Sequence, residues 1–115
     1  MSDFITTPLQ SGDLTSDFAA LYVPPANKVA EIKSLWIKNI SASDGTFSIR
    51  FNFAGSAKAW LVNIPLGAGE SAELIDEAAI GLRGASQNYA GDTIEGAADA
   101  NAKLNYNMFG IVGVQ

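Results

Sequence analysis

The chain has 115 residues, which is enough for one domain around one hydrophobic core and too short for two. It contains no cysteine and no histidine, which excludes disulfides and removes the commonest general base and the commonest transition-metal ligand. The missing histidine leaves a poor inventory for catalysis, so we expect a protein that is not an enzyme and has no cofactor. Seven basic residues against twelve acidic ones give a net charge of −5, so we expect no nucleic-acid partner.

Residues 1–17 are polar and show neither the period of a helix nor that of a strand. We predict an extended N-terminal arm here, ahead of a β-sandwich domain over residues 18–115. Phe4, Ile5 and Leu9 are its candidate contacts with another subunit, and a frayed end is the equal alternative. The arm lacks the features of a secretion signal, and no apolar run is long enough to cross a bilayer. We therefore expect cytoplasmic synthesis and no membrane contact.

Two strands are predicted in the next part of the chain. The apolar run at residues 18–23 ends at Pro24 and Pro25, which cannot donate to a sheet ladder. Residues 28–40 are rich in β-branched and aromatic residues, as a long strand is.

The second of these strands carries the candidate exposed aromatic residue. Alternation places Leu35 and Ile37 on one face and Ile32 and Trp36 on the other, with one bulge or twist in the strand. Polar side chains flank Trp36 two positions away on either side. Trp36 is therefore predicted to make an exposed contact.

The clearest strand signal lies at residues 46–53, where four apolar side chains alternate with four polar ones. A tight-turn pair, Asp-Gly, stands just before it, so residues 28–54 are predicted to form a hairpin. Residues 59–64 are the next strand of this meander, in which Trp60 is predicted to be buried.

The second half of the chain has weaker signals. Short strands are predicted at residues 71–75 and 91–95, and a helical turn at residues 76–79 is an open alternative. Residues 103–114 become apolar throughout towards their end, as a central strand does. Seven or eight short strands around one core predict an all-β fold, an antiparallel sandwich of two sheets.

Acidic residues offer the main candidate chemistry. Asp92, Glu95 and Asp99 have oxygen ligands suited to Ca²⁺, but their spacing is not that of a calcium loop, and solvated turns are favoured. Asp76 and Glu77 are neighbours on a predicted strand and point to opposite faces, which argues against an acid/base pair. We expect no catalytic residue and no metal site.

Four short turn-and-strand segments occur in an order and with a spacing that together suggest a family resemblance. They are AALYVPPAN at 19–27, IKSLWIKN at 32–39, PLGAGE at 65–70 and AGDTI at 90–94. Over residues 19–114 this order resembles small accessory virion proteins of tailed bacteriophages. The resemblance implies a β-sandwich or jelly-roll fold, a place on the capsid, tail or fibre, and no catalytic residues.

Two functions follow from the resemblance and the composition. The first is a capsid decoration or cement protein, located in the virion, that binds the major capsid protein or other virion proteins and stabilises the shell as a homo-oligomer, a trimer being one option. The second is a tail-associated or fibre-associated module that recognises a host surface glycan through exposed aromatic residues.

Overall fold

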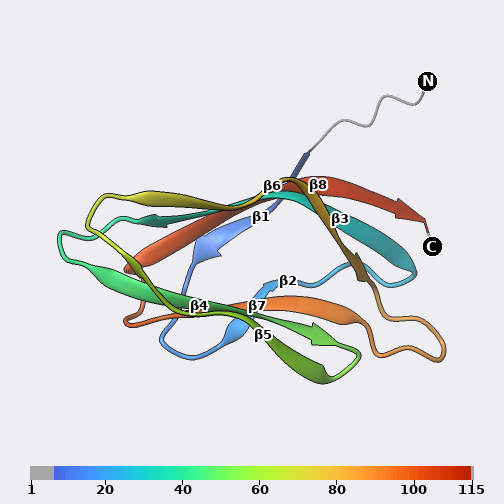
Figure 1. Cartoon of the computed structure of the whole chain (residues 1–115). Coiled ribbons are helices and arrows are strands. Elements are labelled where there is room, and N and C mark those ends of the chain that lie inside the picture. The colour runs from blue at the N-terminus through green and yellow to red at the C-terminus, as the bar shows by residue number, and fades with distance from the viewer. Residues whose placement is uncertain (1–6, 115) are drawn as a thin grey trace.

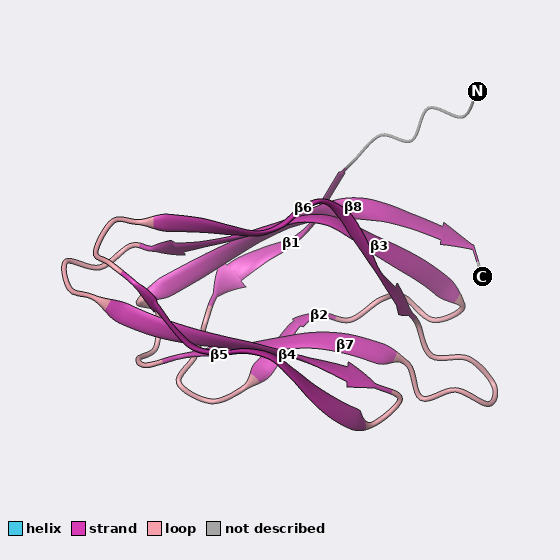
Figure 2. Ribbon diagram, in the orientation of Figure 1, coloured by secondary structure: helices cyan, strands magenta, loops and turns pink. Residues whose placement is uncertain are grey.

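The computed structural model describes residues 7–114, and within this range the side chains of residues 7, 76–79 and 114 are not described. Every regular element in this range is a strand (Figure 2). The strands are β1 (Thr7–Asp13), β2 (Ala19–Tyr22), β3 (Lys28–Asn39), β4 (Gly45–Phe53), β5 (Ser56–Leu66), β6 (Ser71–Arg83), β7 (Asp92–Ala98) and β8 (Leu104–Val114).

The strands form two antiparallel four-stranded sheets that face each other (Figure 1). The first sheet has the order β1-β8-β3-β6, and the second has the order β2-β7-β4-β5. Among the strands of the described range, only β4 and β5 are joined as a hairpin, and every other connection crosses from one sheet to the other. This arrangement is a jelly roll, so the predicted all-β sandwich is confirmed.

The predicted hairpin over residues 28–54 is wrong. The strand β3 pairs with β6 and β8, while β4 pairs with β5 and β7, so β3 and β4 lie in different sheets. Residues 40–44 carry the chain across the sandwich instead of folding it back in a tight turn.

The structure also differs from the predicted arm. Residues 7–13 form β1, the edge strand of the first sheet, where Thr7 pairs with Gly110 and Asp13 with Asn105 of β8. Leu14 follows and is fully buried. An edge strand is held by backbone hydrogen bonds to one neighbour and tolerates polar side chains, which is why this one has no apolar alternation. The sandwich therefore includes residues assigned above to the arm.

A bulge in β3 changes which side chains face the core. The pairing of β3 with both neighbours shifts register between Ile32 and Ser34, as the predicted bulge requires. Because of this shift Ile32 lies in the core with Leu35 and Ile37, whereas Trp36 alone stays on the outer face. The expected grouping of Ile32 with Trp36 is thus wrong.

The stretch of β6 at residues 76–79, where a helical turn was the alternative, is strand. Asp76 is paired with Ser34 of β3. The ladder to β3 continues at Ile80, which pairs with Ile32. Pairing with a central strand overrides the helix propensity of the local sequence.

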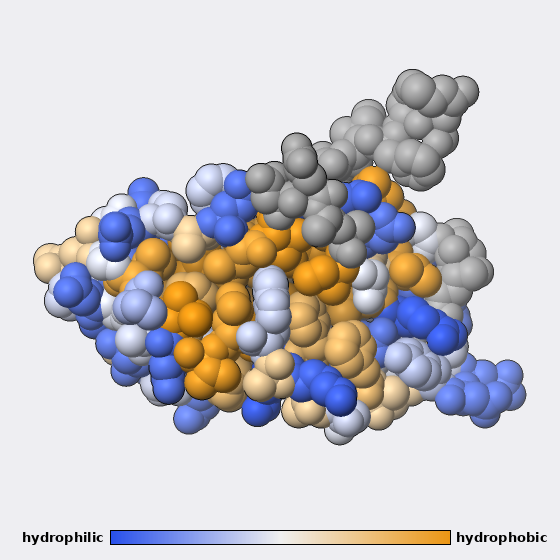
Figure 3. Space-filling view, viewed as in Figure 1, coloured by the Kyte–Doolittle hydropathy of each residue, from blue (hydrophilic) through white to orange (hydrophobic). Residues whose placement is uncertain are grey.

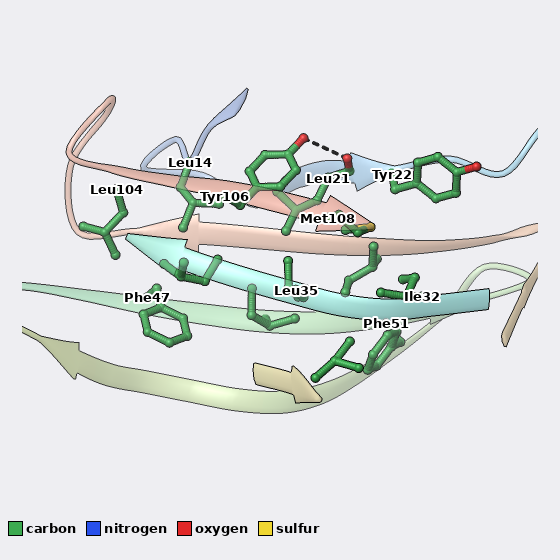
Figure 4. Packing of buried hydrophobic residues seen from close by; sticks show 14 of the residues in the cluster. Leu14, Leu21, Tyr22, Ile32, Leu35, Phe47, Phe51, Leu104, Tyr106 and Met108 are labelled. Carbon is green, nitrogen blue, oxygen red and sulfur yellow. Dashed lines mark hydrogen bonds between the residues drawn. The ribbon is translucent and has the colours of Figure 1, made fainter. Parts of the chain in front are cut away.

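The core lies between the two sheets, and its largest side chains interdigitate there (Figure 4). Phe47, Ile49 and Phe51 project into it from β4, and their polar neighbours in sequence face outwards, as the alternation predicts. The hydroxyl of Tyr106 in β8 donates a hydrogen bond of 2.8 Å to the carbonyl of Leu21 in β2, which joins the sheets (Figure 4). Burial raises the pKa of Tyr106.

Asn39, at the end of β3, is fully buried and has every polar group of its side chain in use. Its amide nitrogen donates to the carbonyls of Ser43 and Leu66, both at 2.9 Å. Its side-chain oxygen accepts from the backbone N–H and the hydroxyl of Ser41, at 2.9 and 2.7 Å. The backbone N–H of Asn39 donates to Glu70. One side chain thus ties together the β3–β4 and β5–β6 connections.

The strand register can be tested at two adjacent positions of β4. Phe51→Asp places a charge in the core and should prevent folding, at a cost of about 4 kcal/mol or more. Asn52→Asp should change the free energy of unfolding by under about 1 kcal/mol, because its side-chain oxygen can still accept from the Gly55 N–H. Urea unfolding followed by circular dichroism measures both, and equal effects would contradict the register.

The tie made by Asn39 can be tested by replacing it with leucine. Asn39→Leu keeps the approximate volume but leaves the buried carbonyl of Leu66 unpaired and removes three further hydrogen bonds, so we expect a loss of about 3 kcal/mol or more in the free energy of unfolding. Ser41→Ala, which removes one hydroxyl donor from the same cluster, is the matched control and should cost about 1 kcal/mol. A loss from Asn39→Leu no larger than the loss from the control would show that the tie is unimportant.

Candidate functional site

The outer face of the first sheet presents Trp36 at the centre of a row of exposed side chains. Glu73 of β6 and Asn107 of β8 lie opposite Trp36 on the neighbouring strands, and Ser11 of β1 lies opposite Asn107. Trp36 is 40% exposed, as predicted from its polar neighbours in sequence. An exposed indole beside an amide and a carboxylate can make both apolar and hydrogen-bonded contacts.

The residues proposed as contacts of the N-terminal arm have different outcomes. Phe4 and Ile5 lie outside the described residues. Leu9 is in β1, and its side chain packs against the core of its own chain. The packing is tight, because a Cβ on Gly110 of β8 would lie 2.9 Å from a methyl group of Leu9. Leu9 thus stabilises its own sandwich, and because it is only partly buried its contact with another subunit stays a prediction.

Asp92, the first of the three acidic residues considered for Ca²⁺, is 4% exposed and serves a structural purpose. Its carboxylate accepts the backbone N–H of Arg83 at 2.8 Å and the hydroxyl of Tyr89. This hydrogen bond raises the pKa of Tyr89. Asp92 therefore joins the end of β6 to the start of β7 and holds the loop between them.

The other two acidic residues have partners of their own. Glu95 accepts the Nε–H of Arg50 at 2.6 Å, and Asp99 pairs with Lys103 at 3.1 Å. The hydrogen bond from Lys103 is the largest cause that lowers the pKa of Asp99. Among the described residues, no group of three or more side chains is placed to hold a metal ion. The side chains of Asp76 and Glu77 lie outside the described set.

An apolar strip lies along the side of the sandwich where the edge strands β5 and β6 run. Figure 3 shows apolar residues gathered along the middle of this face, between the two sheets. We call this strip the apolar seam. Its members are edge-strand side chains that contact the core and keep part of their surface open, namely Trp60, Leu61 and Ile64 of β5 and Ala72, Leu74 and Ile80 of β6.

The expectation that Trp60 is buried is wrong, because the residue is 37% exposed. The register between β4 and β5 shifts where Arg50 pairs with Ala59 and Ile49 with Leu61, so Trp60 has no paired residue opposite it. Its ring instead lies against the ring of Phe51, with 5.4 Å between the centroids. The sequence of β5 reads as a buried strand, and only the strand order shows that β5 is an edge.

The opposite side of the sandwich is closed. There β1 and β2, the other two edge strands, contact each other, and the Tyr106–Leu21 hydrogen bond joins β8 to β2. The core is therefore covered on one side and partly uncovered along the seam. Contiguous apolar surface of this kind is a mark of an interaction site.

The fold and these surfaces define a jelly-roll sandwich with exposed apolar and aromatic residues. No protein-family model matches the sequence, and no curated protein is significantly similar to it. Among solved structures, the CBM22-1 xylan-binding domain of Xyn10C from Paenibacillus barcinonensis is similar at 18% identity and a TM-score of 0.26. The match covers 79% of this chain and 58% of that one, and a TM-score this low carries no argument about function. No helix in the described part of the chain has the length and apolar character needed to span a membrane.

The structural account of the acidic residues can be tested with calcium and two variants. We expect Ca²⁺ or a chelator to leave the melting temperature unchanged. Asp92→Ala should cost about 2 kcal/mol in the free energy of unfolding, because it leaves the N–H of Arg83 without its acceptor. Asp99→Ala, which breaks an exposed ion pair, is the control and should cost about 0.5 kcal/mol. Stabilisation by Ca²⁺ that disappears in Asp92→Ala would contradict the structural account.

Proposed function

We propose that the chain is a non-enzymatic structural protein of a bacteriophage virion, a decoration or cement protein that binds the capsid as a homo-oligomer. The observation that carries the proposal is the apolar seam in an otherwise closed jelly roll. The resemblance of residues 19–114 to accessory virion proteins supplies the kind of particle, and the jelly-roll strand order agrees with it.

The seam suits association between copies better than a transient contact. Interfaces of permanent homo-oligomers are more apolar than the rest of a protein surface and resemble a core cut in two. The seam has this character, because its side chains are the outermost members of the hydrophobic core. A second copy placed there would complete the burial of Leu61, Ile64 and Leu74.

Stabilisation of the shell follows from mass action. A protein that binds the assembled shell and not its separate subunits shifts the equilibrium towards the shell. Copies joined to one another would bind with higher avidity than single copies, since each binding event raises the effective concentration for the next. The net charge of −5 keeps the decorated particles apart in solution.

A glycan-binding module on a tail or fibre is the second candidate. It is supported by exposed aromatic rings beside hydrogen-bonding groups, at Trp36 on the first sheet and at Phe18 on the outer face of the second sheet. Sugars offer apolar ring faces and hydroxyl groups, and this combination of side chains matches both.

The proposal of a seam-mediated oligomer is tested with Leu74→Arg. We expect the wild-type chain to have the mass of a closed oligomer in size-exclusion chromatography with light scattering, and to sediment with capsid shells of the cognate phage. Leu74→Arg should give a monomer that remains folded and no longer sediments, because the charge lies in the seam. Val23→Ser changes a residue that is 61% exposed outside the seam and should leave both properties unchanged.

Two outcomes would contradict the proposal. A wild-type chain that is monomeric over a wide concentration range has no seam-mediated oligomer, and a chain that never sediments with shells is no decoration protein.

Deleting residues 2–6 tests the arm separately, since it leaves β1 intact. We expect this deletion to weaken sedimentation with shells while the melting temperature is retained.

A further inference from the structure

The outer face of the second sheet carries two adjoining hollows with volumes of about 490 and 360 Å³. Phe18, Ser48 and Asn63 line both of them, so the two hollows form one groove across this face. We call it the second-sheet groove. Each volume lies within the range of roughly 300–1,000 Å³ that is typical of small-molecule sites.

A distortion of β5 turns polar groups into the groove. Asn63 has a φ of 50°, in the left-handed region that non-glycine residues seldom adopt, and its backbone N–H donates to the hydroxyl oxygen of Ser48 at 2.9 Å. The hydrogen of that hydroxyl is therefore still available to donate. The side chain of Asn63 is exposed, and no described group is hydrogen-bonded to its side-chain amide.

An aromatic ring and a held guanidinium form the next part of the groove. The guanidinium of Arg50 lies 4.0 Å from the centre of the Phe18 ring, and its Nε–H is fixed by Glu95. These contacts hold the guanidinium in place without using its two terminal nitrogens. Phe18 itself remains 39% exposed. Such a pair offers a rigid apolar ring beside oriented hydrogen-bond donors.

The β5 side of the groove is lined by small and apolar side chains. Ala57 and Ala59 face it opposite Asn52 and Arg50 of β4, and Val62 is 60% exposed. Small side chains let a flat ring approach the strand closely, and an isolated exposed valine adds apolar contact. The groove thus combines apolar surface with a few fixed polar groups.

The charges around the groove disfavour an anionic ligand. Arg50 is paired with Glu95, and Lys103 is paired with Asp99. Of the charged residues that line the groove, Asp17 and Asp99 are acidic and Arg50 is basic, so their sum is −1. A phosphate, a sulfate or an acidic sugar would meet net repulsion here, whereas a neutral ligand with hydroxyl groups would not.

We propose that the second-sheet groove binds a neutral oligosaccharide. The C–H face of one sugar ring lies against the part of the Phe18 ring that Arg50 leaves open, and hydroxyl groups of this sugar and its neighbours bond with Ser48, the side-chain amide of Asn63 and the terminal nitrogens of Arg50. This proposal rests on the glycan-binding candidate and names its site and ligand class. It does not depend on the oligomer formed at the seam.

The test uses soluble short oligosaccharides of glucose, galactose and mannose, with sulfated versions of the same sugars for comparison. Calorimetric titration of the full chain should show binding of at least one neutral oligosaccharide and none of its sulfated version. Phe18→Ala and Asn63→Gly should each weaken binding about tenfold or more. Glycine is chosen at Asn63 because it accepts the positive φ without strain.

Val23→Ser is the matched control, because it changes an exposed apolar residue that lines neither hollow and should leave the affinity unchanged. Trp36→Ala tests the other exposed aromatic ring of the glycan-binding candidate. Circular dichroism confirms that each variant is folded. Binding that is lost in Trp36→Ala and kept in Phe18→Ala would overturn the groove while leaving glycan binding in place. Preference for the sulfated sugars would overturn the neutral ligand class. Absence of binding by any sugar would overturn both the groove and the glycan-binding candidate.

Discussion

The hydrogen bonds of Asn39 are the interaction on which the arrangement of the two sheets depends. Each crossing between sheets must satisfy the backbone groups of its connecting residues, and a buried group such as the Leu66 carbonyl has no water for this purpose. Asn39 supplies two donors and one acceptor at the point where the β3–β4 and β5–β6 crossings meet. An apolar residue of equal size would fill the space and leave those groups unpaired.

The tie at Asn39 lies at one end of the open side of the sandwich. Both connections that it joins lie at the same end, so β5 and β6 are held together there and diverge along their length (Figure 1). Their pairing partners, β4 and β3, lie on the inner side of each edge strand. The apolar side chains of β5 and β6 therefore contact the core on their inner side and stay partly exposed on their outer side. The apolar seam thus lies along these two edge strands, whereas β1 and β2, the edge strands of the opposite side, contact each other.

The sequence predicts elements whose signal is local and misses what depends on strand order. The alternation of Phe47, Ile49 and Phe51 correctly predicts both the strand and its inner face. The same approach fails for β1, whose polar residues are held by backbone pairing with β8, and for the 28–54 hairpin, because a tight-turn pair does not reveal which sheet comes next. Trp36 was found from its polar neighbours. The exposure of Trp60 cannot be predicted in this way, because a run of apolar residues shows neither an edge position nor a register shift.

The sandwich has three exposed surfaces that could bind a partner, and two of them adjoin each other. The seam lies between the sheets, the Trp36 row covers the outer face of the first sheet, and the second-sheet groove lies on the opposite outer face. Leu61 is shared by the seam and the groove, so a second copy at the seam would border one end of the groove. Oligomer formation would then bring several grooves into a fixed arrangement. Weak binding of one sugar at each groove would add up to strong attachment to a surface that displays many sugars, because each bound groove raises the effective concentration at the next.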